Sequence, residues 1–230
     1  MFGSSIPIDH NSTFEVDNLA FYGQYSRDLG DAVKLAFNLR LDHNSTSYQG
    51  VTENEHSVGF AVAQWLAGGK LALTYRFALG GSIYGAVSRG YRAGGVNQNP
   101  SLSDRDRPFD PEYTTNLEMG FRGGGTALTL FHTLRFDQQV SLSRQQNPDD
   151  PNSFSFFIDN ASRGRSSGIE LEQSYRPLSG VHLFGPLGYL KTHVDPYTFE
   201  TDKGPETRGD WAAAHAPNYT FSLGLSLIHI

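Results

Sequence analysis

The chain has 230 residues, a net charge of −6 and no Cys, with 18% charged, 38% hydrophobic and 13% aromatic residues. The lack of Cys excludes disulfides and thiolate metal sites, and the acidic balance without a basic patch argues against a nucleic-acid partner. No run approaches the roughly 18 apolar residues of a membrane-spanning helix, so short alternating stretches must carry any membrane segment. A soluble β-sandwich could share this composition.

The clearest alternation lies between Val33 and Asp42. The odd positions are all large and apolar, whereas the even positions are Lys, Ala, Asn, Arg and Asp. Because successive side chains of a strand point to opposite faces, this segment predicts a strand with one face for lipid and one for water. The same pattern recurs in residues 116–122, 128–137, 169–176 and 219–225, although His132 interrupts the apolar face of its segment.

Tight turns containing Gly are expected at 29–31, 123–125 and 178–180, and long polar segments at 43–57, 92–111, 147–166 and 195–215. The strands expected between them cover 19–28, 32–43, 70–77, 81–91, 113–123, 126–142, 154–160 with 167–177, 180–194 and 216–226. Segment 56–66 is also strand-like. Because strands 32–43 and 70–77 are expected to run in opposite directions, this segment would lie in an extracellular loop or above it. One additional spanning strand there would invert every later turn.

We therefore predict an all-β chain, an antiparallel up-and-down transmembrane β-barrel. It would be partial, with about nine to ten strands of a larger barrel. Residues 1–230 would form the C-terminal portion of that barrel, with 1–18 as a loop. The end of the chain at 225–230 reads like a translated sequencing adapter, and we expect it to be an artefact.

Several short motifs follow one another between residues 70 and 225. They are Ile83–Asn97 (IYGAVSRGYRAGGVN), Phe109–Glu112 with Asn116–Arg122, Asp137–Val140 (DQQV), Asn160–Ser162, Gly168–Glu172 (GIELE), Gly188–Leu190 and Ala216–Thr220 (APNYT). In this order they resemble the later barrel strands of TonB-dependent outer-membrane receptors. The plug domain and coupling box of that family, its earlier strands and its terminal aromatic residue have no counterpart in the sequence.

The resemblance implies active transport of a scarce nutrient, a ferric siderophore above all, across the bacterial outer membrane. Its partners would be outer-membrane lipid, the ligand, and the TonB complex acting through the missing plug and coupling box. No covalent chemistry is implied, so we expect no catalytic residue, cofactor or metal. A passive porin-like channel and a soluble β-sandwich binding module, such as a carbohydrate-binding module, stay open as alternatives. A fragment with two open sheet edges could also lack a function of its own.

The candidate ligand-binding surface is the loop from Tyr91 to Tyr113. Cationic and aromatic groups at a barrel mouth would suit an anionic, ring-bearing chelate. The candidate residues are Tyr91, Arg92, Asn97, Arg105, Arg107 and Tyr113. The alternative is that these are ordinary loop residues that pack against neighbouring loops. Glu170 and Glu172 share a strand face, but we expect them to be solvated or paired with Arg rather than to act as an acid and base.

Overall fold

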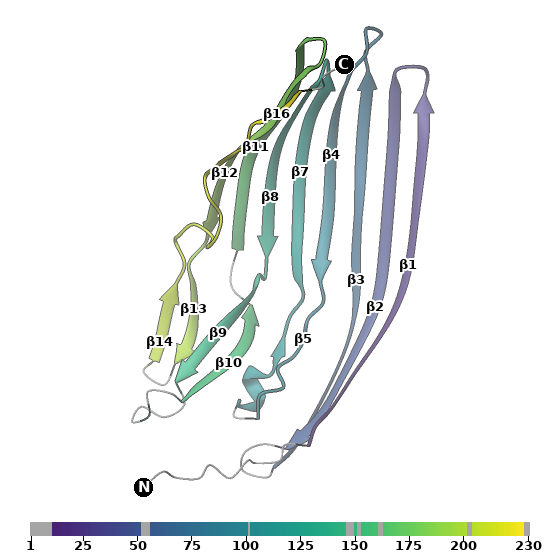
Figure 1. Ribbon diagram of the computed structural model, residues 1–230. Helices are drawn as coiled ribbons and strands as arrows, with labels where there is room; N and C mark the ends of the chain where they lie inside the picture. Colours follow the sequence, from purple (N-terminus) through teal and green to yellow (C-terminus); the bar gives the residue numbers. More distant parts are fainter. Residues whose placement is uncertain are drawn as a thin grey trace.

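A computed structural model describes residues 11–51, 56–100, 102–145, 150, 153–160, 163–201 and 204–227. Most of these residues belong to a single curved antiparallel sheet of ten strands (Figure 1). Its strands, in spatial order, are β1 (Thr13–Leu29), β2 (Val33–Val51), β3 (Ser57–Arg76), β4 (Ser82–Arg92), β7 (Glu112–Gly123), β8 (Thr126–Phe136), β11 (Arg163–Leu178), β12 (Val181–Val194), then β15 (Tyr219–Phe221) and β16 (Gly224–Leu227). The predicted fold class is confirmed, and no helix in the described part is long and apolar enough to cross a membrane.

The register of the sheet gives it two chemically different faces. One row of paired residues is apolar at every position: Leu29, Val33, Tyr75, Ile83, Phe121, Leu128, Leu171, Leu187 and Phe221. A row on the opposite face is polar: Gln24, Asn38, Lys70, Ser88, Asn116, Thr133, Ser166 and Thr192. We call these the outward and the inward face.

No second sheet covers the outward face in the described part of the chain. Its large side chains are exposed, for example Leu39 at 52%, Met119 at 66% and Phe221 at 80%. A β-sandwich would pack such rows against one another across a core. A single sheet that leaves them uncovered instead suits a transmembrane strand array, in which lipid contacts one face and water or protein the other.

Short turns join the strands at one end of the sheet, at the top of Figure 1. The three predicted turns are confirmed, and the left-handed backbone that each requires falls on Gly, with φ of 75° at Gly30, 59° at Gly124 and 79° at Gly180. A fourth short connection, between β3 and β4, ends in Gly80 and Gly81, whose φ values are also positive. Glycine tolerates this conformation because it has no Cβ.

Three small two-stranded sheets lie at the other end, at the bottom of Figure 1. They pair β5 (Gly95–Val96) with β6 (Pro108–Phe109), β9 (Gln139–Gln145) with β10 (Phe154–Asn160), and β13 (Tyr197–Thr201) with β14 (Gly204–Arg208). A 3₁₀ turn, η1 (Asp104–Asp106), lies between β5 and β6. In bacterial outer-membrane barrels the short turns are periplasmic and the long loops extracellular, and on the resemblance described above we refer to this end as the extracellular end.

Several predicted boundaries were wrong. Residues 13–18, expected in a loop, begin β1, and residues 43–51 continue β2 instead of forming a polar loop. Segment 56–66 is the extracellular half of β3, which runs without a break into the predicted strand 70–77. The segment is therefore not an additional spanning strand, and the later turn assignments hold. Residues 1–10 and 228–230 lie outside the described residues, whereas Leu225–Leu227 lie in β16.

Two other predicted strands are divided. Segment 126–142 changes sheets after Phe136, and Asp137 adopts a φ of 54° at the point where β9 begins. Segment 216–226 is split into β15 and β16 opposite Pro186. Ser222 donates a hydrogen bond to the Pro186 carbonyl over 3.1 Å, but Pro186 has no N–H to return. The ladder is therefore interrupted at this pair.

Candidate functional site

The inward face of β2 becomes buried towards its extracellular end. Asp42, Asn44, Thr46 and Tyr48 are all less than 9% exposed, although three of them are polar. They alternate with partly exposed residues on the outward side. The period of two residues therefore continues through this part of β2, with the buried side chains on the inward face. The segment between β4 and β7 packs against these buried residues of β2 from the inward side.

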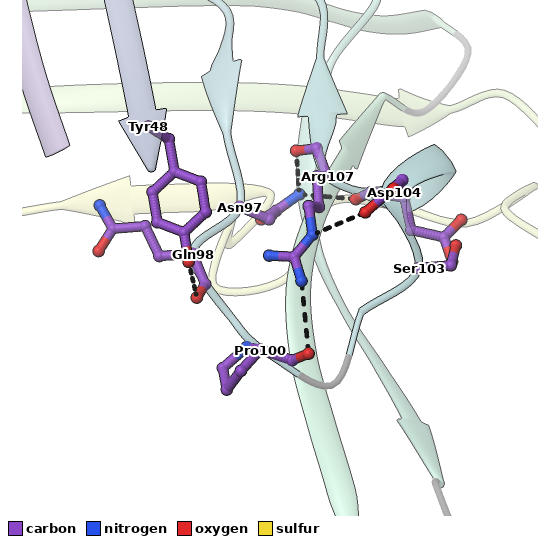
Figure 2. Close-up of polar contacts among 8 residues, drawn as sticks. Tyr48, Asn97, Gln98, Pro100, Ser103, Asp104 and Arg107 are labelled. Atoms are coloured by element: carbon purple, nitrogen blue, oxygen red, sulfur yellow. Dashed lines mark hydrogen bonds and ion pairs between the residues drawn. The ribbon is translucent and has the colours of Figure 1, made fainter. Parts of the chain in front are cut away.

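Arg107 anchors that segment against Tyr48. The Arg107 side chain is 0% exposed, and its guanidinium carbon lies 5.8 Å from the centroid of the Tyr48 ring. Arg107 Nη2 donates to the carbonyl of Pro100 over 3.3 Å, and Nε lies 3.6 Å from a carboxylate oxygen of Asp104. Tyr48 in turn donates its hydroxyl to the carbonyl of Gln98 over 3.3 Å (Figure 2). The aromatic ring and the cation thus fix the loop to the sheet.

A small apolar core supports the same contact. Tyr48, Val58 and Val96 are buried together, with Phe60 and Val62 packed against them. A second core, formed by Leu102, Leu142 and Phe157, lies between η1 and the β9–β10 hairpin. Both clusters belong to the extracellular end, which therefore holds its shape as a soluble domain does, by burying apolar side chains.

Three side-chain amides join the β5–β6 segment to the β9–β10 hairpin. Asn97 donates to the carbonyls of Asp106, Arg107 and Ile158 at 2.7–3.1 Å, and accepts the Ile158 N–H at 2.8 Å. Gln139 donates to the carbonyl of Ala93 over 2.8 Å and to that of Asp110 over 3.1 Å.

Asn160 completes the set. Its amide nitrogen donates to the carbonyls of Asp110 and Asp137, and its amide oxygen accepts the Asp110 N–H at 2.7 Å. Glu112 adds a carboxylate, which accepts the N–H of Gln139 and lies 3.5 Å from Arg135. The motifs FDPE and DQQ thus meet Asn160 in one hydrogen-bonded network, since each supplies a polar side chain that satisfies the backbone of another, and Asn97 bonds the neighbouring backbone of Arg107 and Ile158.

A hollow of about 760 Å³ lies on the inward face beside β1 to β4. Its polar lining includes Gln24, Asn38, Lys70, Arg40, Asp42 and Tyr91. Arg40 Nε donates to Asp42 over 3.0 Å and to the Tyr91 hydroxyl over 3.2 Å. The Tyr91 ring can lie here because residue 68 is Gly, whose added Cβ would stand only 3.0 Å from the ring carbon Cε1.

The structure divides the six predicted ligand-binding residues. Asn97 and Arg107 are buried and hold the loop together. Tyr113 shares the outward face with Leu117 and lies under Arg89, whose guanidinium carbon is 4.5 Å from its ring centroid. Tyr91 lines the inward hollow, whereas Arg92 and Arg105 are exposed.

Sequence reasoning missed Arg40, Asp42 and Tyr48, which form the wall of the site. The sequence gives little signal for the buried part of β2, because the odd and even positions from 43 to 47 are all polar (HNSTS) and fit the loop assigned to 43–57. Glu170 and Glu172 are both exposed and have no ion pair among the described residues.

The acidic residues of η1 form ion pairs with arginines of the same chain. Asp106 forms an ion pair with Arg144 over 2.8 Å, and Asp104 lies 3.6 Å from Arg107. Among the described residues, no group of three or more His, Cys, Asp or Glu is placed to hold a metal ion. Elsewhere at this end, burial raises the pKa of the Tyr197 hydroxyl above its ordinary value, with Asp159 and Glu206 adding to the effect and Arg208 opposing it.

Comparisons with known proteins give consistent results. A family model described as "TonB dependent receptor-like, beta-barrel" matches residues 1–229. Among solved structures, the ferric yersiniabactin uptake receptor FyuA of Yersinia pestis matches with a TM-score of 0.66 and 18% identity, over 94% of this chain and 38% of that one. The copper transporter OprC matches with a TM-score of 0.69 and 18% identity, over 93% of this chain and 33% of that one.

The ferric-catecholate import receptor Fiu of E. coli K12 gives a TM-score of 0.65 and 15% identity, over 92% of this chain and 32% of that one. The chain thus spans about a third of the length of these structures. At these identities the likeness concerns the fold.

Proposed function

The chain belongs to the TonB-dependent receptor β-barrel family of the bacterial outer membrane, and from this membership we propose that it forms the later strands of an active-transport receptor for a scarce nutrient. The observation that carries the proposal is the family match over residues 1–229, together with a sheet whose outward rows are apolar and uncovered and whose inward rows are polar. In a closed barrel this sheet would satisfy its backbone hydrogen bonds inside lipid and enclose a polar lumen.

The ligand class that we propose is a ferric siderophore or a similar anionic metal chelate. Arg92 is exposed at the start of the segment between β4 and β7, and Arg105 is exposed within it. Tyr91 and Arg40 line the hollow on the inward face. Guanidinium groups bind carboxylate or catecholate oxygens through paired hydrogen bonds, and aromatic rings stack on chelator rings. The buried Arg107 would contribute indirectly, by fixing the segment that presents the other two.

A binding experiment on the complete receptor tests this assignment. The probes are the ferric complexes of a catecholate and of a hydroxamate chelator, and the variant is Arg92→Ala with Arg105→Ala. We expect about tenfold weaker binding of the ferric complex that the wild type prefers, since two charge-assisted contacts are lost. Arg176→Ala, which removes an exposed cation near the short-turn end, is the control and should bind normally.

Uptake into cells separates the receptor from a passive channel. Uptake of the preferred complex should stop when the TonB complex is deleted. Uptake that continues unchanged would support the porin-like alternative. Equal affinity of the double variant and the wild type for every probe would remove Arg92 and Arg105 from the ligand site.

A further inference from the structure

On three strands of the outward face, cations follow the apolar residues towards the extracellular end. In β4 the outward positions read Ile83, Gly85 and Val87, and the next is Arg89. In β12 they read Leu187 and Tyr189, and the next is Lys191. In β11 the outward series Leu171, Ile169 and Ser167 is followed by Arg165 and Arg163. We call Arg89, Arg163, Arg165 and Lys191 the basic belt.

The register brings these cations to neighbouring positions. Arg165 pairs with Leu134, which pairs with Thr115, which pairs with Arg89, so the two Arg residues share one row three strands apart. Lys191 of β12 pairs with Ser167 and is therefore diagonal to Arg165. Diagonal neighbours across two strands lie about 7–8 Å apart, which puts Arg165 and Lys191 within reach of one anionic group, with Arg163 two residues further along the same face of β11.

None of the four belt residues has a carboxylate within ion-pair distance in the described part of the chain. Several other cations are paired, among them Arg40 with Asp42, Arg135 with Glu112 and Arg144 with Asp106. Asp195 and Asp210 lie 3.3 and 3.8 Å from His193, the register partner of Arg165.

Aromatic rings contact two of the belt cations. Arg89 lies 4.5 Å above the Tyr113 ring, and Arg163 lies 5.4 Å from the centroid of the Phe136 ring. Below Lys191, the rings of Tyr189 and Tyr219 contact each other at 5.1 Å. Aromatic residues of this kind mark the interface between the hydrocarbon and the headgroups. The four cations are exposed on the outward face, and the aromatic residues beside them suit the depth of the headgroups.

We propose that the basic belt binds the phosphate groups of lipid headgroups in the outer leaflet of the outer membrane. Clustered Lys and Arg beside a membrane segment attract anionic headgroups, and the guanidinium fork matches two phosphate oxygens. The chemistry is non-covalent. This inference depends on the outward orientation of the face and not on the transport function, so a failure of the ligand assignment would leave it intact.

The test uses the complete receptor, extracted from outer membranes in mild detergent. The belt variant is Arg163→Gln, Arg165→Gln and Lys191→Gln. The matched control removes three exposed inward cations, Lys34→Gln, Lys70→Gln and Arg122→Gln. Native mass spectrometry counts the phosphorus-containing lipid molecules that each protein retains. We expect roughly tenfold lower retention by the belt variant, since each cation near a lipid surface contributes severalfold to affinity, and wild-type retention by the control.

Unchanged retention by the belt variant, or an equal loss in the control, would overturn the proposal. Displacement of the bound lipid by millimolar inorganic phosphate would show an anion site with no preference for lipid, which also overturns it. If the triple variant does not fold, as judged by heat-modifiable electrophoretic mobility, Lys191→Gln alone takes its place. It should then lose a smaller but measurable share of the lipid.

Discussion

The membrane-spanning part of the sheet and its extracellular end keep apolar side chains from water in different ways. In the spanning part, rows such as Leu35, Leu73 and Met119 face outward without protein cover and depend on lipid. At the extracellular end, Tyr48, Val58 and Val96 bury one another, and side-chain amides satisfy the loop backbone. The first region is stable only in a bilayer, whereas the second has a core of its own.

A charge introduced on the outward face should have the largest effect on stability, and it tests the difference between the two regions most directly. We expect Met119→Arg to destabilise the folded barrel in lipid vesicles by about 2–4 kcal/mol, because an arginine near the bilayer midplane cannot be solvated there. The inward Asn116→Arg, three residues away on the same strand, should cost little, because it faces the lumen. Urea titration of the folded fraction measures both, and equal costs would contradict the assignment of the faces.

An intermediate effect is expected at the extracellular end from Asn97→Ala. The change leaves the N–H of Ile158 and three carbonyls without their partner, at a cost of about 1–3 kcal/mol for the unsatisfied donor. The loss should be local, with faster hydrogen exchange in residues 98–109 and in β10 and unchanged exchange in β7 and β8. Gln98→Ala, which removes an exposed side chain, is the control. Faster exchange throughout the sheet would show that the two regions are not separate.

The smallest effect should come from Tyr48→Phe. This change removes the hydroxyl that donates to Gln98 but keeps the ring under Arg107, so we expect about 0.5–1.5 kcal/mol of local destabilisation. Tyr48→Ala removes the ring as well and should loosen the loop much further. Limited proteolysis of the β5–β6 segment ranks the three proteins, and identical cleavage of Tyr48→Ala and wild type would exclude Tyr48 as an anchor.

The sequence by itself determined the strands of the spanning region and their two faces. Alternation from Val33 to Asp42 and from Asn116 to Arg122 was sufficient, because a period of two residues is a local property of extended backbone. The Gly turns were equally readable, since positive φ at Gly30 or Gly180 depends on one residue.

Only the tertiary structure decided the roles of the loop residues. Asn97 and Arg107 were predicted as ligand-binding residues from the loop sequence, and the structure shows that Asn97 binds Ile158, 61 residues away, and that Arg107 packs on Tyr48 of β2. A polar side chain in a loop has the same appearance in the sequence whether it faces solvent or satisfies a distant carbonyl. Which of these applies depends on long-range register and burial, and these arise only when the strands are paired and the loops fold back over the inward wall.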